Sequence, residues 1–219
     1  MTSVSRKVEV LEKNRPRQER AKRTYEAILV SAAQLLIEVG VERISTNLIA
    51  ERAGITVPAL YRYFPNKYAV LHALGAAMMD KQNEVGLLWF ERLETLSQPE
   101  LLLENIEELL KLTYKVTCEQ LAGLEIIQSL RAVGPLQELR LQSNRLVADQ
   151  FAALIAEVLG WPLTPVLTMQ SRLSVDMGYA VVELAMEDST LSSDEVLSQG
   201  ALMIQAYWRD ALQNQPSKD

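Results

Sequence analysis

The sequence predicts an all-α protein of about nine helices, with a small N-terminal three-helix unit followed by a larger helical domain. Three observations support this fold class. Apolar residues recur about every 3.6 positions in most segments. No segment alternates apolar and polar residues as a half-buried strand does. Glycine, proline and capping residues separate the helical segments from one another. With 219 residues, 48% of them hydrophobic, the chain can also build a sizeable core.

The first 68 residues contain an arm, an amphipathic helix and two short helices. The arm is polar and charged and ends at Pro16, so we expect it to be flexible. Apolar residues spaced as on one helix face run from Ile28 to Val39, and Gly40 ends that helix. The expected elements are a basic arm over residues 1–16, a helix over 17–39, and short helices over 47–53 and 57–64 with caps at Ser45, Thr46 and Thr56.

Residues 69–219 are expected to form the second domain, after a first helical domain over 17–68. Pro65 breaks the chain before a long helix that begins at Lys67, and Pro99, Pro135 and Pro162 mark later breaks. The expected helices cover residues 67–94, 100–120, 124–132, 136–159, 166–187 and 194–212.

The net charge of −6 is unevenly distributed along the chain. Residues 1–68 hold 12 Lys/Arg against 7 Asp/Glu, a net charge of +5. Residues 69–219 hold 10 Lys/Arg against 21 Asp/Glu, a net charge of −11. This asymmetry indicates a polyanionic partner for the N-terminal part alone.

The segment from Thr46 to Tyr68 has the layout of a helix-turn-helix, two short helices joined by a tight turn at a glycine. Leu60 and Phe64 lie four residues apart and should face the core, which leaves Tyr61, Arg62 and Tyr63 outside it. A tyrosine hydroxyl can reach a DNA phosphate, and an arginine can make a bidentate contact to guanine. Tyr63 has a second interpretation, in which its ring completes the small core.

Cations stand at two helix starts, where the macrodipole favours acidic residues instead. Lys67 begins the long helix, and the first helix opens with Arg17, Arg20, Lys22 and Arg23. A cation beside free helical N–H groups makes a good phosphate site. The same pattern also fits a solvated basic face.

The run ISTNLIAERAGITVPALYRYFPNKYAVLHAL resembles the DNA-binding signature of TetR-family repressors, whose pattern includes I-A-x-x-A-G, L-Y-x-[YH]-F and a following lysine. The resemblance covers about residues 20–74 and implies a homodimer in which each helix-turn-helix enters one half-site. It implies phosphate contacts from Thr46, Thr56, Tyr61 and Lys67. It implies groove-facing positions at Val57, Pro58, Ala59, Arg62 and Tyr63, with Arg43 as a further DNA-binding candidate. Many members carry histidine in place of Tyr63, which weakens its assignment as a direct contact.

The last two helices are apolar on more than one side, which predicts burial on both sides. We expect the second side to contact a partner subunit, with Gly178 and Gly200 allowing close approach; a deep intramolecular core is the alternative. The expected dimer residues are Met177, Val181, Leu184, Leu197, Ala201, Ile204 and Trp208.

The resemblance also implies an effector cavity among the middle helices. The candidate lining residues are Trp89, Tyr114, Cys118, Ile127, Arg131 and Met169, although each type is more often plain core than pocket. A mostly apolar lining with Arg131 as its cation would suit a hydrophobic ligand, including an anionic one.

Other function classes find little support in the sequence. His72 and Cys118, the single histidine and cysteine, have no catalytic partner motif, so we expect no enzyme, and no cofactor or metal is expected. There is neither a secretory signal nor an uncharged run long enough to span a membrane. One cysteine fits a reducing cytoplasm. We therefore expect a cytoplasmic, homodimeric, sequence-specific DNA-binding regulator of the repressor type, released from its operator by a small, largely hydrophobic effector. The alternative is a helical ligand-binding or adaptor protein without specific DNA readout.

Overall fold

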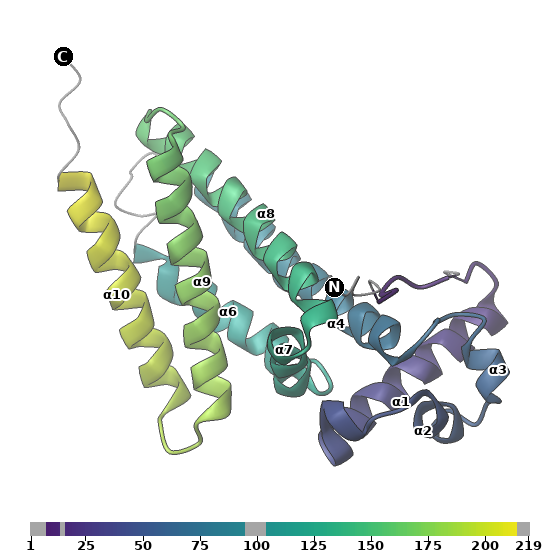
Figure 1. The fold of residues 1–219 in the computed structure, drawn as a ribbon. Coiled ribbons are helices and arrows are strands. Elements are labelled where there is room, and N and C mark those ends of the chain that lie inside the picture. The colour runs from purple at the N-terminus through teal and green to yellow at the C-terminus, as the bar shows by residue number, and fades with distance from the viewer. Residues whose placement is uncertain (1–7, 14–15, 95–103, 214–219) are drawn as a thin grey trace, which may run out of the picture. The chain divides into compact units, whose positions relative to one another are not determined.

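The computed structural model describes residues 8–13, 16–94 and 104–213. These ranges contain nine helices and no strand, which confirms the all-α prediction (Figure 1). The helices are α1 Glu19–Arg43, α2 Thr46–Arg52, α3 Val57–Leu60, α4 Lys67–Glu94, α6 Ile106–Cys118, α7 Gly123–Ala132, α8 Gly134–Leu159, α9 Pro165–Glu187 and α10 Ser193–Gln213. The start of the helix expected over 100–120 falls outside the described residues.

The chain packs as two compact units. The first comprises residues 1–80 and 119–141, and the second comprises residues 81–118 and 142–219. Helices α4 and α8 therefore each contribute one end to each unit.

Helix α1 supplies much of the core of the first unit. Ile28, Ala32 and Leu36 lie four residues apart and are fully buried. Their face packs with Leu60 and Phe64, and α7 lies against α1 in the same unit. By length and composition, α1 is the one helix in the described ranges that could cross a membrane. Its apolar residues include the core positions above, so burial in the protein explains part of that composition.

Two glycines with positive φ shape the first unit. Gly40 (φ 74°) interrupts α1 at the predicted stop, and the chain makes one more turn before Ile44. Gly54 (φ 64°) makes the tight turn between α2 and α3. The helix expected over 57–64 was too long, because helical geometry ends at Leu60 and the chain continues in a turn. Phe64 is nevertheless fully buried, since the turn keeps its ring on the core side.

The core of the second unit is built from α4, α6, α8, α9 and α10. Trp208 lies at its centre, and its indole Nε1 donates to Ser174 Oγ at 2.8 Å. Gly200 lets α10 approach α9, because a Cβ at this position would lie 2.4 Å from Val181 Cγ1. Gly178 faces Leu110 of α6, where a Cβ would lie 3.3 Å from Leu110 Cδ2, a tight contact. Both glycines therefore serve packing within one chain, where the sequence had suggested contact between subunits.

Four of the expected dimer residues belong to this core. Leu197, Ala201, Ile204 and Trp208 are each less than 5% exposed within one chain. Their side chains are already covered within one chain, and their place in a dimer interface stays a prediction. Met177 and Val181 are half-buried against the same core, whereas Leu184 is exposed. The apolar stripe of α10, which the sequence assigned to a partner subunit, packs mainly against α6 and α9 of the same chain.

Candidate nucleic-acid interface and ligand cavity

The helix-turn-helix is positioned by caps and by a few buried side chains. Ser45 caps α2 by accepting from the Leu48 amide at 3.3 Å, and Thr56 caps α3 by accepting from the Ala59 amide at 3.4 Å. Ile49 of α2 and Leu60 of α3 are completely buried and hold the two helices on the core. The opposite face of α3 is thereby left to the surface.

Two predicted phosphate-contacting residues touch each other. The hydroxyls of Thr46, at the start of α2, and Tyr61, at the end of α3, lie 3.2 Å apart. The Tyr61 side chain is 42% exposed. Because one of the two hydroxyls donates to the other, the pair can still offer a proton to an anion outside it. Thr56 is exposed as well, but its hydroxyl already caps α3.

The residues expected to face the groove divide into two groups. Pro58 and Arg62 are exposed, and Ala59 is half-buried. Val57 packs partly against the core, which leaves less of it for a base contact. Arg43 is exposed, and its Nε donates to the Val39 carbonyl at 3.0 Å.

Tyr63 is part of the core of the first unit. Its ring meets the Tyr25 ring edge-on at a centroid distance of 6.2 Å. Its carbonyl accepts from the Lys13 amide at 2.7 Å, so the described end of the arm runs beside it. These contacts favour the interpretation in which Tyr63 completes the small core.

The Lys67 side chain, expected to contact a DNA phosphate, hydrogen-bonds to backbone carbonyls of its own chain. Its ammonium donates to the carbonyls of Val41, Glu42 and Ile44 at 3.1, 3.2 and 3.1 Å. An ammonium has three donors, so these carbonyls can use all of them. The sequence signal for this role was the helix end at Gly40, because carbonyls at a helix C-terminus lack intrahelical partners and attract cations. In this structure the Lys67 ammonium therefore caps the end of α1, and its contact with a DNA phosphate stays a prediction.

Additional cations line a groove on the first unit. Arg20 and Arg23 of α1 line it, together with the acidic Glu19 and with Thr24, Ala27, Ala53 and Ile55. Both arginines are exposed. Arg52, by contrast, forms a two-pronged ion pair with Glu38 at 2.7 and 2.6 Å, which ties α2 to α1. The hydrogen bond from Arg52 holds the pKa of the Glu38 carboxyl below its usual value.

The second unit contains a cavity between its helices. Of the six candidate ligand residues, Trp89 lines this cavity. The full lining consists of Gln82, Gly86, Trp89, Phe90, Ile106, Leu109, Leu110, Thr113, Val147, Phe151, Ser174, Val175, Gly178, Tyr179 and Ile204.

The other five candidates lie elsewhere. Cys118 and Met169 are exposed, and Tyr114 packs at the edge of the core. Ile127 and Arg131 belong to the first unit, where Arg131 is exposed. On α6 the inward positions are Thr113 and Thr117, one turn apart, so the adjacent Cys118 points away.

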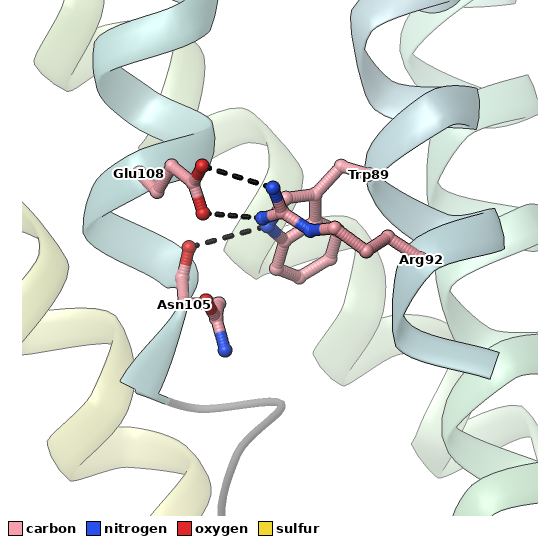
Figure 2. Close-up of polar contacts among 4 residues, drawn as sticks. All are labelled: Trp89, Arg92, Asn105 and Glu108. Atoms are coloured by element: carbon pink, nitrogen blue, oxygen red, sulfur yellow. Dashed lines mark hydrogen bonds and ion pairs between the residues drawn. The ribbon is translucent and has the colours of Figure 1, made fainter. Parts of the chain in front are cut away.

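Figure 2 shows how α4 and α6 are joined in the second unit. The indole Nε1 of Trp89 donates to the Asn105 carbonyl at 3.2 Å. One turn further along α4, the Arg92 guanidinium makes a two-pronged ion pair with the Glu108 carboxylate. These contacts fix the Trp89 ring as one wall of the cavity.

Comparison with known proteins matches the first unit. Residues 28–74 match the family model described as bacterial regulatory proteins, tetR family. The chain is 48% identical over 54 residues to the tetracycline repressor protein class C of Escherichia coli, a segment that is 25% of each chain. It is 48% identical over 52 residues to the class A repressor from transposon 1721 of Escherichia coli, which is 24% of each. The matched segment thus spans about a quarter of the length of these relatives.

Solved structures resemble the fold of nearly the whole chain. A putative TetR-family transcriptional regulator from Syntrophomonas wolfei aligns with a TM-score of 0.66 and 15% identity, covering 90% of this chain and 99% of that one. The SmeT–triclosan complex aligns with a TM-score of 0.60 and 20% identity, covering 84% and 90%. At these identities the likeness establishes the fold.

Proposed function

We propose that this chain, which belongs to the TetR family of bacterial regulatory proteins through its N-terminal domain, is a sequence-specific DNA-binding transcriptional repressor released by a small, largely apolar effector. The observation that carries the proposal is the surface of α2 and α3. The Thr46–Tyr61 hydroxyl pair and the exposed Arg62 stand together on the segment that matches the family model.

The roles of these residues follow from their chemistry. Hydroxyl groups bind phosphate oxygens without reading sequence, so Thr46 and Tyr61 set the position of α3 on the DNA. Arg62 reads a base in the major groove, where a guanidinium pairs with guanine O6 and N7. Arg20 and Arg23 add positive charge to the first unit and strengthen binding to any duplex.

The active species in this proposal is a homodimer, with one half-site for each DNA-binding domain. Support comes from apolar side chains that one chain leaves exposed on its last two helices: Val166, Met169, Leu173 and Leu184 on α9, and Leu202 and Met203 on α10. Exposed large apolar side chains of this kind are candidates for an interaction surface. The interface is therefore reassigned from the buried stripe of α10 to this surface.

Effector binding is assigned to the cavity of the second unit, within the regulatory domain expected over residues 69–219. The SmeT structure with triclosan is a related fold in complex with a small molecule. The regulator acts in the cytoplasm, where its DNA lies, and no catalytic step is assigned to it.

The test is the binding of purified protein to a pool of random duplexes, followed by selection of preferred sequences. We expect a palindromic site, and affinity for any duplex that falls steeply as salt rises, because phosphate contacts release counterions. A helical adaptor would show neither enrichment nor this salt dependence. Either negative result, from folded protein, would contradict the proposal.

A further inference from the structure

The cavity of the second unit has a wall without charge. Aromatic and aliphatic side chains make up most of it, with rings from Trp89, Phe90 and Phe151. None of the described lining residues is acidic or basic. A bound ion would lose its hydration there without meeting an opposite charge, which disfavours charged ligands strongly.

Two sets of paired charged groups lie on the helices that line the cavity. Arg92 and Glu108 neutralise each other between α4 and α6 (Figure 2). On α9, the Asp176 carboxylate accepts from Asn144 Nδ2 at 2.5 Å and pairs with Arg172 Nε at 2.8 Å. Arg131, the cation expected from the sequence to suit an anionic ligand, belongs to the first unit and is exposed.

Three polar side chains of the lining retain hydrogen-bonding capacity. Gln82 is 6% exposed and donates from Nε2 to Thr117 Oγ1 at 2.7 Å, while its Oε1 has no hydrogen-bond donor among the described residues. Thr113 is 8% exposed, and its hydroxyl has no hydrogen-bond partner in the described part of the chain. The same holds for the phenol of Tyr179. None of these atoms is among the fully buried unsatisfied side-chain atoms of the described residues, so water reaches them, and a ligand in the cavity can replace that water.

The phenol of Tyr179 is a neutral group at physiological pH. Burial, and secondarily the Asp176 carboxylate, raise its pKa to about 12. It therefore offers an O–H donor and a lone-pair acceptor but no charge. Ser174, by contrast, is occupied: its hydroxyl accepts from Trp208 and donates to the Gln170 carbonyl at 2.9 Å.

We infer that this cavity binds an uncharged, mainly aromatic molecule carrying a hydroxyl group, with hydrogen bonds from Gln82, Thr113 and Tyr179. The rings of the wall take the apolar body, and the three polar side chains select against molecules that lack a hydrogen-bonding group. The inference rests on the proposed function only for the regulatory consequence of binding.

Three naphthalene probes of similar size separate charge from hydrogen bonding. Calorimetric titration of the full-length protein at neutral pH compares 1-naphthol, naphthalene and 1-naphthoate. We expect one 1-naphthol to bind per chain, naphthalene to bind about tenfold more weakly, as expected for one lost hydrogen bond, and 1-naphthoate not to bind. Equal binding of 1-naphthoate, or no binding of 1-naphthol, would overturn the inference.

Variants locate the binding in this cavity. Gly86 lines it, and a Cβ there would meet no atom within 4 Å, so Gly86→Leu adds a bulky side chain to the lining at a position with room for its Cβ. Gly134→Leu is the matched control, because Gly134 also has open space but is exposed and outside the lining. We expect only Gly86→Leu to abolish 1-naphthol binding. Gln82→Leu should weaken 1-naphthol and spare naphthalene, a distinction that a general loss of structure would not produce.

Binding to duplex DNA, measured on the same preparations, separates the two proposals. Binding of 1-naphthol without binding to DNA would support this inference and contradict the proposed function. Binding to DNA without 1-naphthol binding would contradict this inference alone.

Discussion

The Lys67 ammonium lies 3.1 Å from the Val41 carbonyl, so the first residue of α4 caps the end of α1. Two more carbonyls of the same helix end share the ammonium. This contact holds the start of α4 against the end of α1. We therefore expect Lys67 to stabilise the folded protein.

Replacing Lys67 by methionine should therefore destabilise the protein. The substitution keeps most of the stem but removes the donors to three carbonyls, at a cost of about 1–3 kcal/mol for groups left unpaired. Urea unfolding measures this loss, and Lys22→Met on the exposed part of α1 is the control. If Lys67 were instead a phosphate contact, stability would be unchanged and the slope of DNA affinity against salt would fall by about one.

Replacing Tyr61 by phenylalanine should weaken binding to all DNA sequences by a similar factor. The change removes the hydroxyl that meets Thr46 but keeps the ring, and phosphates carry no sequence information. Fluorescence anisotropy with operator and random duplexes gives the two affinities. Tyr114→Phe, in the second unit, is the control. A changed sequence preference would show that Tyr61 reads bases.

Replacing Arg62 by alanine should relax sequence preference at about one base pair, by roughly 1–3 kcal/mol. The reason is the loss of a bidentate contact that discriminates guanine. Selection from random duplexes, before and after the change, gives the preference at each position. Arg145 is exposed on α8, and Arg145→Ala, the control, should leave the sequence preference unaltered. An identical preference in the Arg62 variant would rule out the base contact.

Acidic substitutions on the exposed apolar surface should produce monomers. Met169 is 55% exposed and Met203 is 60% exposed, so Met169→Asp and Met203→Glu place charge on the surface without disturbing the core. Sedimentation velocity reports the oligomeric state. Leu146→Glu, on the exposed side of α8, should remain dimeric. Dimers that survive both methionine substitutions would place the interface elsewhere.

The Glu38–Arg52 ion pair should contribute stability at neutral pH and lose it in acid. The pKa of Glu38 is lower in the folded protein than in the unfolded chain, so the contribution is present above the unfolded pKa and disappears as pH falls through the folded one. The effect is small because both side chains are solvent-accessible. Thermal melts of Glu38→Gln should show a weaker dependence on acid pH than the unmodified protein. If the melting temperature of the variant fell with acid pH as much as that of the unmodified protein, the acid sensitivity would come from other groups.

The sequence predicted the helices well because their signals are local. Gly40, Gly54 and Pro65 interrupt the chain within a residue or two of where the structure does, since backbone conformation at glycine and proline depends on the residue itself. The length of α3 was the exception. Residues 61–64 were expected to form its last turn, but they leave the helix after Leu60. Their backbone conformation depends on tertiary packing rather than on helix propensity.

The sites were predicted less completely. The segment from Thr46 to Arg62 was identified because its pattern is long and specific. The lining of the cavity was not identified from the sequence: of the six candidate residues, only Trp89 lines it. Gln82, Gly86 and Trp89 share one face of α4 at helical spacing, but nothing local distinguishes that face from ordinary core.

The sequence by itself determined the all-α class, most of the helix boundaries and the charge asymmetry, because each depends on residues close together in the chain. Only the tertiary structure decided that Lys67 caps α1, that the apolar stripe of α10 is covered by its own chain, and that the cavity lacks charge. An apolar face or an ammonium group can be satisfied by many partners. Which partner it meets depends on how helices distant in sequence pack together.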